Sequence, residues 1–195
     1  MAFDADPRWL GDAAWPGNAP LVDASSGAEP PYDLHAPPVD PAVFKEALAG
    51  LASGVAIVSC WDGVTPRGLL VSSITGLSVD PPRFLFCVRK EASSHDVLVQ
   101  AQRCGVAILS EEDEAEALRF ASSSLSHERF SPDAWRLTDA TPPTYRGGLT
   151  TTACVIDQRI DAGTHTIFIV TATSVALTPG QPLVAHARSF QRLAI

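Results

Sequence analysis

Two long runs of β-branched residues in the C-terminal half of the chain constrain its fold more than any other feature. Residues 149–160 and 166–177 are rich in Thr, Val and Ile, and Asp161, Ala162 and Gly163 lie between them. β-Branched side chains favour strands, and a short turn segment with glycine between two such runs is typical of an antiparallel hairpin. The sequence therefore predicts an antiparallel sheet with its longest strands near the C-terminus.

Further strand patterns occupy the middle of the chain. Residues 55–61 and 68–74 flank a turn at Asp62-Gly63, which predicts a second hairpin. Asp80-Pro81-Pro82 must interrupt the ladder, because proline lacks the amide donor. Additional strands are expected at residues 84–89, 105–110 and 182–190. Strands that follow strands argue against a doubly wound parallel sheet, so the pattern predicts an all-β barrel with a few helices.

Three amphipathic segments predict those helices. The first begins after Asp40, which can cap it, and Gly54 is its expected stop. The second begins at Ser93 or Ser94, either of which can act as the N-cap. The third covers residues 112–121, with acidic side chains in its first turn, as the helix dipole favours. A polar loop follows, whose aromatic residues Phe130 and Trp135 either gate a site or belong to the core.

The first 40 residues differ in composition from the rest. They hold seven acidic residues against one basic residue, and half of the chain's 16 prolines lie at or before Pro41. Such a segment disrupts both helix and strand periodicity. We therefore predict a proline-rich acidic N-terminal arm over residues 1–40 and a folded domain over residues 41–195. Apolar residues such as Trp9 and Trp15 leave two alternatives for the arm, disorder or docking on the folded body, a neighbouring subunit or a pocket.

Charge and hydropathy exclude several classes of partner. A net charge of −8 over 195 residues repels phosphate backbones and anionic lipid, so no nucleic acid partner is expected. No apolar run approaches the roughly 18 residues that cross a bilayer. The acidic start of the chain is unlike a secretory signal. The sequence thus predicts a cytoplasmic protein with no membrane partner.

Common catalytic and metal-binding motifs are absent from the sequence. The four cysteines, Cys60, Cys87, Cys104 and Cys154, form no CxxC pair, which favours buried free thiols over disulfides or metal ligands. Glycine-rich nucleotide motifs, HExxH and GxSxG are also missing, so no metal is expected. The adjacent residues 94–96, Ser-His-Asp, are not a triad, because neighbours on a helix point in different directions.

The segment 68–82 is the most informative part of the chain. Ser72, Ser73, Thr75 and Gly76 follow an apolar strand and precede the Pro81-Pro82 turn. Small side chains leave backbone N–H groups accessible, which suits a flat heterocycle with a hydroxylated chain, such as a flavin. An ordinary solvent-facing strand end rich in Ser and Thr is the alternative.

This segment resembles the flavin-binding motif of the flavin reductase-like family, the short-chain NAD(P)H:flavin oxidoreductases that supply reduced flavin to two-component monooxygenases. Other landmarks follow in the family's order over residues 42 to about 193: Phe44, residues 54–58, Asp62-Gly63, Asp80-Pro81-Pro82, Arg89-Lys90, Ser93-Ser94, Phe120, Phe130, Gly163-Thr164-His165, Pro182-Leu183, Arg188 and Phe190. The resemblance implies a mainly β, homodimeric split β-barrel with a few flanking helices and the flavin near the dimer interface.

The resemblance also implies roles for individual residues. Flavin ribityl and phosphate contacts fall on Ser72 and Ser73. Backbone contacts to the ring fall on Thr75, Gly76 and Leu77. Arg89 or Lys90, with Ser93 and Ser94 at a helix start, would receive the phosphate, a placement that a cation beside free helix N–H groups also favours. A solvated ion at a strand end is the alternative for Arg89 and Lys90. Phe130, Arg188 and Phe190 complete the expected flavin-binding set.

His165 matches the histidine of the family's Gly-Asp-His motif, which is associated with nicotinamide binding, and is the predicted catalytic residue. Thr164 stands in place of the aspartate. Leu70 and Ile74 stand where the family often carries Thr and Phe. Without the resemblance, a lone histidine at a strand start is an ordinary surface or core residue.

The resemblance therefore implies reduction of FMN or FAD by NADH or NADPH, with a flavin-dependent monooxygenase as the recipient of reduced flavin. The departures at Thr164, Leu70 and Ile74, together with the arm, motivate a second hypothesis. It is a repurposed split barrel that binds flavin or another ligand without reductase activity and catalyses a redox-free cyclisation in natural-product biosynthesis. Acceleration of flavin reduction by the protein discriminates between the two.

Overall fold

The computed structural model describes residues 37–193. Residues 1–36, which make up most of the predicted arm, lie outside the described residues. The chain divides between Lys45 and Glu46 into two units, and the second carries all the described strands. Helix α1 (Pro41–Ala49) begins as predicted, since the Ala42 N–H donates to the Asp40 carboxylate at 2.7 Å. The helix ends before the expected stop at Gly54, and none of its residues is buried.

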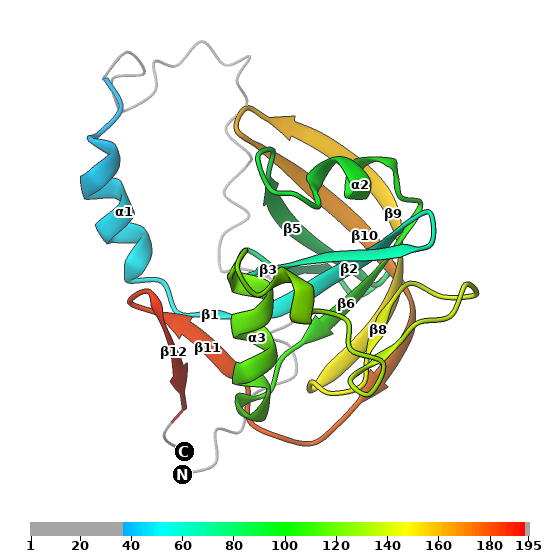
Figure 1. The fold of residues 1–195 in the computed structure, drawn as a ribbon. Helices are drawn as coiled ribbons and strands as arrows, with labels where there is room; N and C mark the ends of the chain where they lie inside the picture. The colour runs from blue at the N-terminus through cyan, green and yellow to red at the C-terminus, as the bar shows by residue number, and fades with distance from the viewer. Residues whose placement is uncertain (1–36, 194–195) are drawn as a thin grey trace. The chain divides into compact units, whose positions relative to one another are not determined.

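A seven-stranded antiparallel sheet forms the centre of the second unit (Figure 1). In spatial order its strands are β3 (Thr65–Val71), β2 (Ala56–Asp62), β6 (Arg103–Ile108), β9 (Thr150–Ala162), β10 (His165–Leu177), β5 (Arg83–Arg89) and β4 (Thr75–Ser78). Both predicted hairpins are present, because β2 pairs with β3 and β9 pairs with β10. The prediction of a mainly β fold with few helices is confirmed.

Smaller elements surround this sheet. Strands β1 (Ser53–Gly54), β11 (Leu183–His186) and β12 (Ser189–Arg192) form a three-stranded sheet, and β7 (Trp135–Arg136) pairs with β8 (Thr144–Tyr145). The remaining helices are α2 (His95–Gln100), α3 (Glu114–Ala121) and the 3₁₀ turns η2 (Glu111–Asp113) and η3 (Ser126–Glu128). The prediction of a single strand over residues 182–190 is wrong, because β11 and β12 are separate strands. Ala187 and Arg188 adopt left-handed conformations, with φ of 49° and 62°, and reverse the chain between β11 and β12.

Strand β2 separates two hydrophobic cores. Successive side chains of a strand point to opposite faces, so β2 is buried along most of its length. Ala56 and Val58 belong to the first core, which also contains the stacked rings of Phe86 and Phe168. Ile57 belongs to the second core, beneath α3. The apolar run that predicted this strand therefore reflects burial on both faces.

The aromatic residues of the loop after α3 lie in the second core. The ring centroids of Phe130 and Trp135 are 4.6 Å apart, and Phe120 packs against both. Trp135 is 2% exposed, and its Nε1–H donates to a Glu116 carboxylate oxygen at 2.7 Å. The sequence left two roles open for Phe130 and Trp135, gating a site or packing in the core. The structure places both residues in the core.

The four cysteines are free, as predicted. Cys60, Cys104 and Cys154 are buried, whereas Cys87 is partly exposed. Burial, with the nearby Asp62 carboxylate, raises the pKa of Cys60 to about 12. The Cys104 thiol also has a raised pKa, because it donates a hydrogen bond to Cys154 and is buried. These three thiols are therefore structural parts of the first core.

Candidate functional site

A cavity of about 430 Å³ opens where β3, β5 and the start of β10 approach one another. This volume lies within the roughly 300–1,000 Å³ typical of small-molecule sites. The lining comprises Leu69, Leu70, Val71, Ser72, Ser73, Cys87, Val88, Arg89, Ala92 and His165. Most of these side chains are apolar, and the polar ones come from the ends of strands. The cavity thus suits a ligand with a flat apolar body and a few polar groups.

The cavity lies where the two ends of the seven-stranded sheet come together. β3 is the first strand in the sheet and β5 is next to last, yet the segment that follows β3 is hydrogen-bonded to β5. The Ser73 hydroxyl donates to the Cys87 carbonyl at 3.0 Å and accepts from the Cys87 N–H at 3.0 Å. This hydroxyl has used its hydrogen, so toward a ligand Ser73 can only accept. Ser72, which is exposed beside it, keeps a hydroxyl with no hydrogen bond to the described residues.

The predicted ring-binding segment forms strand β4, the last strand of the sheet. Thr75, Gly76 and Leu77 are exposed, and β4 pairs only with β5 among the described strands. The register with β5 shifts between Gly76 and Ser78, which leaves Leu77 without a paired residue. Backbone groups on the outer edge of β4 are therefore accessible, as the prediction requires, although these three residues do not themselves line the cavity.

Arg89 and His165 meet at the cavity from neighbouring strands. They are paired residues in the antiparallel register of β5 and β10, and both line the cavity. The Arg89 guanidinium contacts the Glu91 carboxylate at 2.7 Å, and both side chains are largely exposed. An exposed pair of this kind contributes only about 0–1 kcal/mol. A phosphate can therefore compete with Glu91 for the guanidinium.

The His165 imidazole has one ring nitrogen engaged and one available. Its Nδ1 lies 2.9 Å from Oγ1 of Thr164, the residue that stands in place of the family aspartate. The hydroxyl can donate to or accept from Nδ1, so it orients the ring without adding a negative charge. Nε2 has no hydrogen-bond partner among residues 37–193 and can contact a ligand.

Lys90 points to a different partner from Arg89. Its Nζ contacts both carboxylate oxygens of Asp161, at 2.9 and 2.8 Å. The cavity lining includes Arg89 but not Lys90. Of the two cations that the sequence offered for a flavin phosphate, Arg89 is the one placed at the cavity.

The residues before α2 have mainly structural contacts. Ser94 occupies the N-cap position, but the prediction that its side chain caps the helix is wrong. Ser94 is buried, and its hydroxyl donates to the Gly68 carbonyl at 3.0 Å. Ser93 is exposed and does not line the cavity. The predicted phosphate contacts of both serines stay predictions.

The neighbouring His95 confirms that residues 94–96 are not a triad. Its Nδ1 lies 2.8 Å from an Asp96 carboxylate oxygen, and its Nε2 lies 2.9 Å from the Thr166 hydroxyl. Both ring nitrogens are thus engaged, and neither contacts Ser94. The contact with Thr166 ties α2 to β10 next to His165.

Three other predicted flavin ligands lie elsewhere in the second unit. Phe130 packs in the second core. Arg188 is paired with Glu46, and Phe190 is partly buried against the second core from β12. None of the three lines the cavity, so a contact with a bound flavin stays a prediction for each.

Sequence reasoning missed the apolar wall of the cavity. Leu69, Val71, Cys87, Val88 and Ala92 line it without having been proposed as site residues. Four of them lie in apolar runs that predicted strands, and Ala92 lies between a predicted strand and a predicted helix. The available signal was their adjacency to Ser72 and Arg89, because residues flanking a site residue on a strand end share its surroundings.

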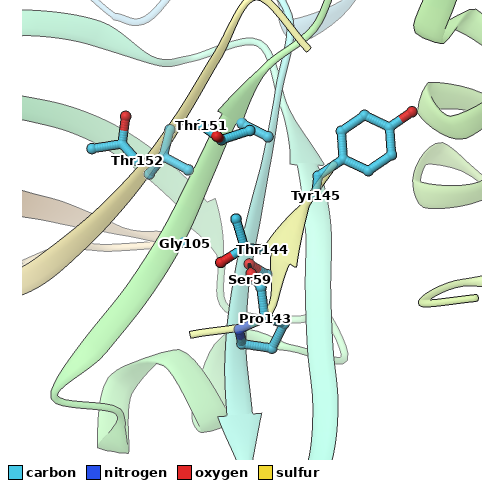
Figure 2. Close-up of a pocket in the computed structure, with 9 residues that line it drawn as sticks. Ser59, Gly105, Pro143, Thr144, Tyr145, Thr151 and Thr152 are labelled. Atoms are coloured by element: carbon cyan, nitrogen blue, oxygen red, sulfur yellow. Dashed lines mark hydrogen bonds between the residues drawn. The ribbon is translucent and has the colours of Figure 1, made fainter. Parts of the chain in front are cut away.

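A second hollow lies between β2, β6, β8 and β9 (Figure 2). It has no volume that a water molecule can enter. At its base the Ser59 hydroxyl donates to the Pro143 carbonyl at 2.6 Å. A Cβ on Gly105 would lie 2.6 Å from both of these oxygens, so this place requires a glycine.

Within residues 37–193, His, Cys, Asp and Glu side chains form no group of three or more that could hold a metal ion. Each described helix is too short or too polar to span a membrane.

Comparison with known sequences decides the family. The sequence profile of the flavin reductase like domain matches residues 48–194, which is most of the chain. The chain belongs to the flavin reductase-like family. The resemblance and the split-barrel fold that the sequence indicated are confirmed.

Relatives within the family carry different names. The chain is 28% identical to FMN reductase (NADH) SmoA of Agrobacterium fabrum, over 76% of this chain and 84% of that protein. It is 27% identical to the reductase component of 4-nitrophenol 4-monooxygenase/4-nitrocatechol 2-monooxygenase of Rhodococcus opacus, over 75% and 77%. It is 30% identical to the actinorhodin polyketide dimerase of Streptomyces coelicolor, over 79% and 87%. Most family members named among its relatives are thus NADH-dependent flavin reductases, and one is a dimerase.

A solved structure of the family superposes on the chain. The NADH:FAD oxidoreductase SgcE6 of Streptomyces globisporus, in complex with NAD and FAD fragments, matches with a TM-score of 0.73 and 28% identity. The match covers 82% of this chain and 98% of that one. The fold described above is therefore that of the flavin reductase-like family.

Proposed function

We propose that this protein reduces FMN or FAD with NADH or NADPH and releases the reduced flavin to a flavin-dependent monooxygenase. The observation that carries the proposal is the cavity of about 430 Å³ with apolar walls and with Arg89 and His165 paired at its edge. Family membership and the names of the relatives support it.

The residues at the cavity fit a flavin. Leu69, Val71 and Val88 offer an apolar wall for a planar ring system. Ser72 can donate to a ribityl hydroxyl, and Ser73 can accept from one. The Arg89 guanidinium suits a phosphate, because its planar fork matches phosphate oxygens. Family position assigns Thr75, Gly76 and Leu77 to the ring edge, where the open side of β4 offers backbone N–H groups.

His165 fits the nicotinamide side of the site. Its Nε2, which is unpaired within the described part of the chain, can hydrogen-bond to a carboxamide. A carboxamide carries both an oxygen acceptor and an N–H donor, so either imidazole tautomer has a partner. Thr164 holds the ring from the other nitrogen. The role of His165 in this proposal is to position the dinucleotide by hydrogen bonding. This role requires no proton transfer by the imidazole.

The reaction requires positioning more than a reactive side chain. Hydride passes from nicotinamide C4 to flavin N5, and solvent supplies the proton that completes the reduced flavin. The protein contributes an apolar cavity that excludes water, a cation for the phosphate and an oriented imidazole, all held by the ends of three strands. Proximity and orientation of two bound rings supply most of such an acceleration.

The same proposal includes a homodimer in the cytoplasm. Val175 and Leu177 are exposed apolar residues two positions apart on β10, one of the two long strands. Apolar side chains gathered on one sheet are typical of an interface. Four free cysteines suit a reducing compartment. Light scattering on the purified protein tests the dimer, and a monomer at micromolar concentration would contradict it.

An anaerobic assay tests the activity. Purified protein is mixed with FMN or FAD, NADH or NADPH is added, and the loss of flavin absorbance is followed beside a protein-free control. We expect at least one of the four pairs to bleach much faster than the control. If none does while flavin binding is saturated, the proposed activity is overturned.

A second candidate is a non-reductase role, in which the cavity binds flavin or another ligand for a redox-free cyclisation. The relative named as a polyketide dimerase favours it, as do Leu70 and Thr164 at positions where the family pattern differs. The same assay separates the two candidates. Flavin binding without acceleration of its reduction would favour the second.

A further inference from the structure

The turn that carries His165 is held from outside by one lysine. Residues 163–164 connect β9 to β10, with Gly163 in a left-handed conformation at φ 71°. The Asp161 carboxylate accepts from the Gly163 N–H at 2.9 Å, and both of its oxygens accept from Lys90 Nζ. The backbone N–H of Lys90 also donates to the Thr164 carbonyl, at 3.0 Å. Lys90 therefore binds this turn through its side chain and its main chain.

The contacts continue from the turn to the imidazole. Thr164, whose carbonyl accepts from Lys90, places its hydroxyl 2.9 Å from Nδ1 of His165. Residues 161–165 are all exposed, so hydrophobic packing contributes little to their position. The strand ladders pair His165 with Ala162 and with Arg89, and the polar contacts made by Lys90 and Asp161 add a further restraint on the turn.

Lys90 itself does not face the cavity. The cavity lining includes its neighbour Arg89 but not Lys90, which lies in the turn that follows β5. A role for Lys90 as a phosphate ligand would require it to leave Asp161, where it contacts both carboxylate oxygens. The hydrogen bond from Lys90 also lowers the pKa of Asp161, which keeps this carboxylate charged.

We propose that Lys90 and Asp161 are positioning residues, which fix the 161–164 turn so that His165 presents Nε2 to the cavity. The proposal rests on the proposed function, because His165 is taken there to bind the nicotinamide. It assigns Lys90 a task on the dinucleotide side of the reaction and none in binding flavin.

Steady-state kinetics of Lys90→Met and Asp161→Asn test the proposal. We expect the KM for NAD(P)H to rise about twofold to fivefold in each, the factor that corresponds to loss of an exposed ion pair. The flavin Kd should stay unchanged. The double variant should resemble either single one, because the residues act as a pair. Lys90→Arg should restore most of the wild-type KM.

Arg67→Met is the matched control. Arg67 pairs with Asp62 across the β2–β3 turn, with both side chains about half exposed, and neither residue lines the cavity. Its loss should leave the KM for NAD(P)H unchanged. A raised flavin Kd in Lys90→Met with an unchanged KM for NAD(P)H would overturn the proposal and return Lys90 to the phosphate site.

A separate measurement distinguishes failure of this proposal from failure of the proposed function. If the wild-type protein reduces no flavin with any donor, the function is overturned, and the turn is then examined by NMR. The His165 ring resonances should shift or broaden in Lys90→Met and Asp161→Asn but not in Arg67→Met. Ring resonances that match the wild type in all variants would overturn the positioning role.

Discussion

Arg89 and His165 lie directly opposite each other on β5 and β10, and both line the cavity. Paired residues of antiparallel strands have Cβ atoms about 4.5–5.5 Å apart. A ligand at this edge of the cavity therefore meets a guanidinium and an imidazole together. In the proposed reaction the two serve different molecules, the guanidinium a flavin phosphate and the imidazole a nicotinamide, so variants at the two positions should have separable effects.

His165→Ala should impair the dinucleotide side of the reaction. Loss of one hydrogen bond to the carboxamide is expected to raise the KM for NADH or NADPH about fivefold to tenfold. The flavin Kd, measured by fluorescence quenching without the dinucleotide, should change little. Equal losses in both quantities would contradict this assignment of His165.

Arg89→Gln should impair binding of phosphorylated flavin. The affinity for FMN is expected to fall about tenfold, because a charge-assisted hydrogen bond is lost. Riboflavin, which has the same ring and ribityl chain without the phosphate, is the matched ligand and should bind the variant as it binds the wild type. Glu91→Gln removes the competing carboxylate and should tighten FMN binding slightly. An equal loss of FMN and riboflavin would place Arg89 away from the phosphate.

The strands of this protein were predictable because their signals are local. The runs at 149–160 and 166–177 became β9 and β10, and residues 84–89 became β5, which begins one residue earlier than predicted. The reversal at Ala187 and Arg188 was missed, since neither residue type favours the left-handed conformation.

The site was only partly predictable, because its contacts are not local. Ser72, Ser73, Arg89 and His165 were identified through the family resemblance. Their meeting depends on closure of the sheet between β3 and β5, strands far apart in its order. The pairing of Lys90 with Asp161 joins residues 71 positions apart, and no periodicity encodes such a choice of partner. Ser94 shows the same limit, since its hydroxyl donates to Gly68 rather than capping its own helix.

Cys87 should be the one thiol of the folded protein that reacts quickly. It is partly exposed at the cavity, whereas the other three cysteines are buried and burial raises the pKa of Cys60 to about 12. At pH 8, N-ethylmaleimide followed by mass spectrometry should show a single modification, lost in Cys87→Ser. Saturating FMN should slow this modification. An unchanged rate would mean that flavin does not occupy the cavity.

Asp161 should titrate below its ordinary range because of Lys90. The pKa of this exposed carboxyl is lowered first by the hydrogen bond from Lys90 and then by that from the Gly163 N–H. A lowered pKa means that the pair with Lys90 is fully present above the ordinary carboxyl pKa and is lost as the pH falls through the lowered value. Carbon-detected NMR should show the Asp161 midpoint moving upward in Lys90→Met and staying low in Lys90→Arg. A midpoint that Lys90→Met does not move would contradict the contact.

Gly105→Ala should destabilise the fold without touching the cavity. A Cβ at this position would lie 2.6 Å from the Pro143 carbonyl oxygen and from the Ser59 hydroxyl, which are hydrogen-bonded to each other (Figure 2). Overpacking of this kind costs about 1–3 kcal/mol, which lowers the Tm of a protein of this size by several degrees. Gly54→Ala is the matched control, because its Cβ meets no atom within 4 Å. Thermal unfolding followed by circular dichroism should separate the two variants, and equal Tm values would show that the β6 backbone moves to accept a side chain. Gly105 does not line the flavin cavity, so the Kd for FMN at 20 °C below the Tm should be unchanged in the destabilised variant as well.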